Sequence, residues 1–397
     1  MILYQMLKNT AYTYPQKAAI IYDKKEITYQ EFLRQVEQLQ QCLRLLNICN
    51  DMRVGLILHN SDMYCITLYA LSKNDNIICL MNPLFSEDDI EKKIKSAELD
   101  VVIVEDYVWK VLKEKKTELC NVIRFVTRGQ VQELMKSVVN KEDNEWSKAN
   151  ESDLERKELI QSSSGTTGHS KMAYRTQRNL LCDAKNLVST LQYTSSDIVY
   201  CPVPMCHGYG LTMGIIAPIM CGATIVIERV FRCKYFLDNY DEIKPTIFLG
   251  IPETYEEMCT HLKGRKFNFS YRKWFFCSGA PLKREIGETF YEISNLWISQ
   301  VLGMMEVSTI CVNMKPTRDN FLSVGTPVSN VDVKLDKYGK SKCKCIFVKS
   351  ETVSTEYIEE GKTVSIEFYN GWFNTKDIGE INEKGELYVK GRVGEEV

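Results

Sequence analysis

The chain has 397 residues and nearly balanced charge, with 50 lysines and arginines against 52 aspartates and glutamates, a net charge of −2. Apolar residues make up 44% of the chain and charged residues 26%, which excludes a disordered chain and an electrostatic nucleic-acid binder. At about 150 residues per domain, the length predicts two or three units and a sizeable core. The segment 1–10 lacks the basic and long apolar regions of a secretory signal, so we expect a cytoplasmic protein.

Two features that could suggest another class of protein have simpler interpretations. The fifteen cysteines are odd in number and scattered, and no export signal precedes them, so reduced thiols are expected. The uncharged run 208–227 is long enough to cross a membrane, but it contains Pro218 and several glycines. Its last part, 223–227, is β-branched, which predicts a buried helix, a turn and a strand, with no membrane contact.

The first part of the chain alternates helical and strand patterns. Thr28 and Glu31 form a capping box, and the apolar residues that follow up to Leu46 recur at steps of four and three. After this helix the pattern predicts strands over 53–58, 76–80 and 101–104 and helices over 63–71 and 87–98. Alternation of this kind predicts a mainly parallel sheet covered on both faces.

The α/β pattern resumes after a charged connection over 130–158. It predicts strands over 198–200, 224–227, 245–249 and 274–276 and a helix over 178–191. From about Phe321 the period changes to short alternating strands, over 331–335, 345–348, 364–368 and 385–389. We therefore expect an α/β fold of two layered units, 1–158 and 159–320, and a small antiparallel β unit, 321–391.

The strongest local signal is the segment 163–171, Ser-Ser-Gly-Thr-Thr-Gly-His-Ser-Lys, between a predicted strand and a predicted helix. Its glycines, hydroxyl groups and one lysine suit a loop that folds around phosphate oxygens. A flexible Ser/Gly linker is the alternative. The loop is not a Walker A motif, because Ser170 and Met172 stand where that motif needs a glycine and a hydroxyl residue. Gly208 and Gly210 do not form a dinucleotide fingerprint either.

This loop resembles that of the adenylate-forming superfamily, which contains acyl- and aryl-CoA synthetases, firefly luciferases and peptide-synthetase adenylation domains. The family loop reads Thr/Ser-Ser-Gly-Thr/Ser-Thr-Gly-x-Pro-Lys-Gly. Further segments resemble family motifs in the same order along the chain: Pro-Met-Cys-His over 204–207, Ser-Gly-Ala-Pro-Leu over 278–282, Leu-Gly-Met-Met-Glu over 302–306, Gly-Trp-Phe-Asn-Thr-Lys-Asp over 371–377, and Gly-Arg over 391–392. The resemblance implies the N-terminal domain of that fold, with two αβαβα-type subdomains and a small barrel-like β subdomain.

The resemblance also implies a set of site residues. Those for the ATP phosphates are Ser163, Ser164, Gly165, Thr166, Thr167, Gly168 and Lys171. Those for adenine and ribose are Ser278, Gly279, Ala280, Pro281, Leu302, Gly303, Asp377 and Arg392. The acid pocket would include His207, Tyr209, Ile251, Gly303, Met304 and Met305. Glu306 would bind Mg²⁺, and His207, Glu306 and Lys171 would be the catalytic residues.

Three departures from the family pattern affect this interpretation. Leu302 replaces a tyrosine that flanks adenine, so that stacking is lost. Met305 replaces a threonine, which removes a hydroxyl donor beside Glu306. The chain also stops at Val397, where the family continues past a hinge, here 392–397, into a lysine-bearing C-terminal domain. We therefore expect an excised or naturally shortened protein that has little adenylation activity alone.

The predicted function is ATP-dependent activation of a carboxylic acid as acyl-AMP, with release of pyrophosphate, followed by transfer to a thiol. The thiol would belong to CoA or to the phosphopantetheine of a carrier protein. No aspartate occurs over 204–211 to bind an α-ammonium group, so an acyl or aryl acid is preferred over an α-amino acid. The alternatives are a stand-alone adenylation protein that loads an acyl or peptidyl carrier protein, and a catalytically silent nucleotide- or acyl-adenylate-binding module.

Overall fold

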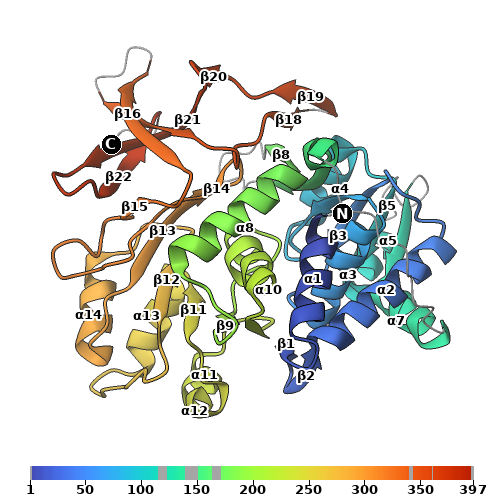
Figure 1. Ribbon diagram of the computed structural model, residues 1–397, viewed down its shortest axis with the longest axis horizontal. Helices are drawn as coiled ribbons and strands as arrows, with labels where there is room; N and C mark the ends of the chain where they lie inside the picture. The colour runs from blue at the N-terminus through green and yellow to red at the C-terminus, as the bar shows by residue number, and fades with distance from the viewer. Residues whose placement is uncertain are drawn as a thin grey trace.

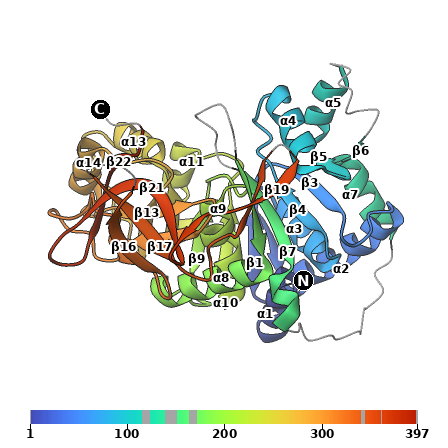
Figure 2. The same cartoon turned by 90° about the horizontal axis from the view of Figure 1, so that it is seen from above.

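The computed structural model describes residues 2–114, 123–138, 151–162, 171–338, 343–359 and 361–394. Two α/β halves lie side by side, and a small antiparallel sheet lies over the half that contains β13 (Ser299–Met304) (Figure 1). The view from above shows that β18 and β19 extend from this small sheet toward the other half (Figure 2). The predicted α/β class is confirmed, with two layered halves and an antiparallel β unit.

The first half is built on an eight-stranded sheet in the order β19-β18-β8-β7-β4-β3-β5-β6. The strands from β7 to β6 are parallel, and β8, β18 and β19 add antiparallel neighbours. The bounds are β3 Arg53–Ile57, β4 Ile77–Leu80, β5 Val101–Val104, β6 Arg124–Thr127, β7 Lys157–Ser162, β8 Met172–Thr176, β18 Glu356–Glu359 and β19 Lys362–Ser365.

The second half is built on a nine-stranded sheet in the order β15-β14-β13-β12-β11-β9-β10-β1-β2. Its central strands, from β13 to β1, are parallel, and they are rich in the aliphatic and aromatic side chains that a sheet covered on both faces requires. The remaining bounds are β1 Ala18–Tyr22, β2 Lys25–Thr28, β9 Ile198–Cys201, β10 Thr224–Ile227, β11 Ile247–Gly250, β12 Trp274–Cys277, β14 Ser308–Val312 and β15 Thr326–Pro327.

The small sheet is antiparallel throughout and runs β16-β17-β21-β20, with β22 paired to β21. Its bounds are β16 Asp332–Lys337, β17 Lys344–Lys349, β20 Phe368–Tyr369, β21 Trp372–Ile381 and β22 Leu387–Arg392.

The helices cover both large sheets, and α1, α8 and α10 lie between the two halves (Figure 1). The helices of the first half are α1 Ile2–Thr13, α2 Tyr29–Leu45, α3 Asp62–Lys73, α4 Glu87–Ala97, α5 Asp106–Glu114, α7 Arg128–Ser137 and the short η1 Glu151–Glu155. Those that follow are α8 Gln177–Leu191, α9 Gly208–Leu211, the π-helical turn η2 Thr212–Ile216, α10 Ala217–Cys221, α11 Cys233–Asp238, α12 Tyr240–Ile243, α13 Pro252–His261 and α14 Arg284–Ser294.

The local signals in the sequence explain several of these boundaries. Thr28 caps α2, since its hydroxyl accepts from the Glu31 amide and the Glu31 carboxylate accepts from the Thr28 amide, so the predicted capping box is confirmed. The uncharged run 208–227 forms α9, η2, α10 and β10, as predicted. In the described residues no helix is both long and apolar enough to cross a membrane. The cellular location stays a prediction.

Two pairs of strands belong to a different sheet from the strands next to them in the sequence. Residues 18–28 form β1 and β2, which pair into the sheet of the second half, and residues 356–365 form β18 and β19, which pair into the sheet of the first. Sequence order had suggested the first half for 18–28 and the small β unit for the strand near 364. Periodicity shows which residues face a core, whereas the partner of a strand is chosen by distant contacts.

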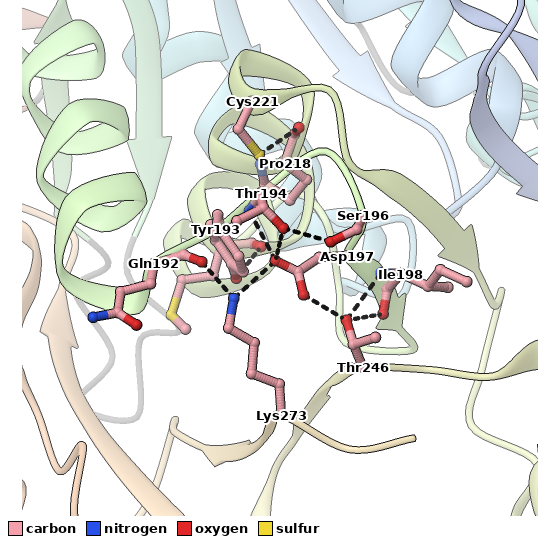
Figure 3. Close-up of polar contacts among 11 residues, drawn as sticks. Gln192, Tyr193, Thr194, Ser196, Asp197, Ile198, Pro218, Cys221, Thr246 and Lys273 are labelled. Atoms are coloured by element: carbon pink, nitrogen blue, oxygen red, sulfur yellow. Dashed lines mark hydrogen bonds and ion pairs between the residues drawn. The ribbon is translucent and has the colours of Figure 1, made fainter. Parts of the chain in front are cut away.

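A fully paired polar cluster fastens the amino ends of three parallel strands. Asp197, just before β9, accepts from the Thr194 amide at 2.8 Å and from the Thr246 hydroxyl at 2.9 Å, and it forms an ion pair with Lys273 at 3.0 Å. Lys273 also donates to the Gln192 carbonyl. Figure 3 shows these side chains converging on the Asp197 carboxylate. Since Thr246 precedes β11 and Lys273 precedes β12, one carboxylate ties together the starts of β9, β11 and β12.

Candidate active site

Several of the predicted site residues lie at or just after the ends of parallel strands. Ser278 follows β12, Ile251 follows β11 and Gly303 lies at the end of β13. The carboxyl ends of parallel strands are where open α/β sheets bind ligands, because loops diverge there and backbone amides are available. The fold therefore brings segments that are distant in sequence to one edge.

Of the residues predicted to bind the ATP phosphates, only Lys171 lies within the described part of the chain. Ser163, Ser164, Gly165, Thr166, Thr167 and Gly168 lie outside the described residues. Lys171 is described, directly before β8. Its Nζ is 3.6 Å from Glu359 Oε1 and 4.8 Å from the centre of the Tyr357 ring. Both partners belong to β18, which pairs with β8 through Tyr357 and Ala173. The lysine thus already faces a carboxylate that an incoming phosphate would have to replace.

Glu306 lies in the turn between β13 and β14 and is 8% exposed. Its Oε1 accepts a 2.6 Å hydrogen bond from the Tyr357 hydroxyl, and its carbonyl accepts one of 2.7 Å from the Ser354 amide. Burial, and secondly the charge of Glu306, raises the pKa of Tyr357, so this hydroxyl keeps its proton and acts as a donor. The carboxylate is held in a defined position.

The residues predicted for adenine form an exposed turn after β12. The Ser278 hydroxyl donates to the Val301 carbonyl at 3.0 Å, while Gly279, Ala280 and Pro281 are exposed. Gly279 has φ +90°, a backbone conformation that favours glycine. This turn leaves its backbone accessible beside the end of β13.

Leu302 and Gly303 continue this surface on β13. Leu302 is half-buried and Gly303 is exposed. A Cβ on Gly303 would lie 2.6 Å from the Ser308 carbonyl oxygen, so the close approach of β14 requires glycine there.

The two residues predicted for ribose lie opposite each other. Asp377 on β21 and Arg392 on β22 are direct partners in the strand register, and Arg392 Nη1 is 3.9 Å from Asp377 Oδ1. The Thr375 hydroxyl accepts from the Asp377 amide at 3.1 Å. Arg392 is also close enough to Tyr357 to lower the pKa of that phenol.

The predicted acid pocket combines buried and half-buried side chains. The Tyr209 hydroxyl is buried near Gly250 and Cys277 and has no hydrogen-bond partner among the described residues. Ile251, Met304 and Met305 are half-buried. His207, directly before α9, has a lowered pKa because of burial and then the charge of Lys93, so its imidazole is neutral at pH 7.

The structure brings three predicted residues around one tyrosine that the sequence interpretation did not include. Lys171, Glu306 and Arg392 all interact with Tyr357. The sequence interpretation also missed Glu359 and two buried charges behind the site, Arg175 and Asp183. Arg175 did carry a signal, because it is a charged residue in an otherwise uncharged strand.

The donor set suits Mg²⁺, a hard cation that usually binds through one or two carboxylates, substrate phosphates and water. Glu306 supplies one oriented carboxylate. Within the described parts of the chain, no group of three or more histidine, cysteine, aspartate or glutamate side chains could hold a metal alone. A metal here would therefore depend on a phosphate ligand.

Comparison with known families shows the class of protein. The chain belongs to the family of AMP-binding enzymes, whose model matches residues 7–354. The relatives with curated names include a long-chain-fatty-acid–CoA ligase of Bacillus subtilis, 23% identical over 98% of this chain and 76% of that ligase. A 2-succinylbenzoate–CoA ligase of Listeria monocytogenes is 25% identical over 94% of this chain and 75% of that ligase.

The fold is similar to that of solved structures. The inhibitor-bound N-terminal domain of FACL13 from Mycobacterium tuberculosis superposes with a TM-score of 0.87 at 22% identity, covering 98% of this chain and 99% of that chain. This likeness agrees with the predicted N-terminal-domain architecture.

Proposed function

We propose that the chain activates a carboxylic acid with ATP, forming acyl-AMP and pyrophosphate, and that the acyl group is then passed to a thiol. In the first step a carboxylate oxygen bonds to the α-phosphorus, and the bond from that phosphorus to the pyrophosphate oxygen breaks. In the second step the thiolate takes the acyl group and AMP leaves. Adenylation is needed because a carboxylate has no adequate leaving group.

The arrangement of Lys171, Glu306 and Tyr357 carries this proposal. An anionic acid must approach an anionic phosphate, so the site needs positive charge and oriented donors. Lys171 would bind the terminal phosphates, displacing Glu359, and Glu306 would hold Mg²⁺, which neutralises phosphate charge when bound. Asp377 would accept from the ribose hydroxyls. The neutral imidazole of His207 would line the path between acid and thiol without repelling a cation or attracting a second anion.

The pocket favours an acyl or aryl acid. Ile251, Met304 and Met305 offer apolar surface, and the buried Tyr209 hydroxyl, which has no hydrogen-bond partner among the described residues, would donate to a substrate oxygen. The relatives named above carry the names of ligases for a long-chain fatty acid and for 2-succinylbenzoate, which supports an acid of this kind. The acceptor is CoA or the phosphopantetheine of a carrier protein.

The test has two parts. Calorimetry should detect binding of AMP and tighter binding of a non-hydrolysable acyl-sulfamoyl-adenosine, with Glu306→Gln weakening only metal-dependent nucleotide binding. A panel of fatty and aryl acids should then be assayed for pyrophosphate exchange, with CoA and a phosphopantetheinylated carrier compared as acceptors. Failure to bind AMP or any acyl-sulfamoyl-adenosine would contradict the proposal.

A second candidate is a catalytically silent module that binds nucleotide or acyl-adenylate. Leu302 cannot stack on adenine as an aromatic ring would, and Lys171 already faces Glu359. Binding of acyl-sulfamoyl-adenosine without exchange for any acid, even at high enzyme concentration, would favour this module over the ligase.

A further inference from the structure

Arg175 is an unusual residue for its position. It lies on β8, four residues after Lys171, and is among the largest fully buried side chains of the described chain. Its Nη1 donates a 3.2 Å hydrogen bond to the carbonyl of Met305, the peptide group that leads into Glu306. Its Nε and Nη2 have no hydrogen-bond partner among the described residues.

Asp183 on α8 is the first counter-charge of Arg175, and Glu306 is the second. The Asp183 side chain is buried, and neither of its oxygens has a hydrogen-bond partner in the described parts of the chain. Burial raises the pKa of Asp183, and the charge of Arg175, together with the nearby Ser308 and Thr212 hydroxyls and Thr309 amide, offsets part of that rise. Two buried acids therefore lie beside one buried cation.

Stability alone does not account for this arrangement. Burying an ion costs several kcal/mol, and a well-packed apolar side chain at the same position is often neutral or stabilising. The preceding residues of β8, Met172, Ala173 and Tyr174, are buried and uncharged. Within the described residues, the hydrogen bond from the guanidinium goes to the turn that carries Glu306, so the guanidinium supports that turn.

We propose that Arg175 is a positioning residue for Glu306, with Asp183 as its counter-charge, and that this pair sets the affinity of the chain for a divalent metal–nucleotide complex. The inference rests on the proposed function, in which Glu306 binds the metal. It assigns a role to two residues outside the motifs on which the family resemblance is based.

The mechanism is preorganisation of one carboxylate. The turn is held by Arg175 at the Met305 carbonyl, by the Ser354 amide at the Glu306 carbonyl, and by the Tyr357 hydroxyl at Glu306 Oε1. A ligand that is already oriented loses little conformational freedom when a metal binds. Without the guanidinium, the turn would lose one anchor and Glu306 would lie near Asp183 with no cation between them.

The experiment separates metal-dependent from metal-independent binding. Mn²⁺ is titrated in the presence of α,β-methylene-ATP and followed by electron paramagnetic resonance, and AMP binding is measured by calorimetry without metal. For Arg175→Met we expect about tenfold weaker Mn²⁺–nucleotide binding, the size typical of lost support around a metal ligand. AMP affinity should stay within about twofold, because AMP needs neither Glu306 nor the metal.

Lys273→Met is the matched control, because it removes a cation that lies beside a buried aspartate, here in the Asp197–Lys273 ion pair at the amino ends of the strands (Figure 3). It should lower the melting temperature and leave both affinities unchanged. Arg175→Lys keeps the charge but loses the planar fork, so about threefold weaker Mn²⁺ binding is expected. If Arg175→Met does not fold, this variant decides the question.

The possible results are distinct. Unchanged Mn²⁺–nucleotide affinity in the folded Arg175 variant overturns the inference and leaves the proposed function standing. Equal losses of AMP and Mn²⁺–nucleotide affinity also overturn it, because they indicate a general packing defect. A wild-type chain that binds neither ligand contradicts the proposed function and this inference together.

Discussion

Buried polar groups at the amino ends of the parallel strands in the second half are better hydrogen-bonded than those near the candidate site. At the amino ends of β9, β11 and β12, Asp197 is paired with an amide, two hydroxyls and an ammonium group. Near the carboxyl ends, the buried Tyr209 hydroxyl has no hydrogen-bond partner among the described residues, and on β8 and α8 the buried Arg175 and Asp183 are only partly satisfied or not at all within that same part of the chain. Satisfied groups stabilise a fold, whereas unsatisfied buried groups cost free energy and mark places selected for another reason.

The largest effect is expected for a variant that removes the Asp197 carboxylate from the amino ends of the strands. Asp197→Ala should lower the free energy of unfolding by about 4 kcal/mol, because it removes the carboxylate and leaves Thr194, Thr246 and Lys273 without their shared acceptor. Urea denaturation measures this change. AMP affinity of the folded variant should be unaltered. A loss of unfolding free energy below about 1 kcal/mol would mean that the Asp197 contacts stabilise the fold no more than an exposed ion pair does.

The second effect tests the free-energy cost of burying the Asp183 carboxylate, which depends on pH. Burial raises the pKa of Asp183 to about 6, above its value in the unfolded chain. The folded state therefore holds this proton more tightly, and its contribution to stability is lost as the pH rises from about 4 to above 6. The loss is about 3 kcal/mol.

Asp183→Asn removes that titration. The free energy of unfolding of the wild type, measured by urea denaturation at each pH, should fall relative to that of the variant between pH 4 and 7. If the unfolding free energies of wild type and variant change in parallel with pH, burial does not raise the pKa of Asp183.

The third effect concerns phosphate binding at the candidate site. Lys171→Ala should weaken ATP binding about tenfold, since a charge-assisted contact is lost, and should change AMP binding less than twofold. Calorimetry with both nucleotides distinguishes the two. Lys157→Ala is the matched control, because Lys157 forms a 2.5 Å ion pair with Glu356 on the same strand β18. Equal effects of the two variants on ATP binding would remove the special role of Lys171.

The smallest effect tests whether adenine binds beside Leu302 on β13. Leu302→Tyr should tighten AMP binding about fivefold, since an aromatic ring beside adenine adds about 1 kcal/mol. Leu302→Met, which adds no ring, should leave the affinity unchanged. If tyrosine also has no effect, adenine does not lie on this part of β13.

The elements were predictable from the sequence because their signals are local. The capping residues Thr28 and Glu31 and the β-branched run before Glu228 act within a few positions of the chain. The motifs around Glu306 and Asp377 were found in the same way. Their roles stay predictions, but their positions at one edge follow from the parallel sheet and from the register of β21 with β22.

The contacts between those motifs were not predictable. Tyr357 lies in the segment Glu-Tyr-Ile-Glu, which looks like any short strand, and its place beside Lys171 depends on the pairing of β18 with β8. Arg175 could be noticed as a charge in an apolar strand, but its partner Asp183 faces it across the packing of a helix on a sheet. Pairing and packing of this kind are decided by the whole core and not by any window of sequence.

The exchange of strands between units has a consequence for the order of folding. Strands β18 and β19 complete the eight-stranded sheet from a segment that the ribosome makes long after β8, and they deliver Tyr357 and Glu359 to the Lys171 neighbourhood. Contacts of such high contact order form late. A nascent chain that ends before residue 356 already contains all the parallel strands of both large sheets. It lacks β18, and with it the Tyr357 and Glu359 side chains that contact Lys171. The contacts of Tyr357 and Glu359 with Lys171 therefore form only after β18 has been made and has paired with β8.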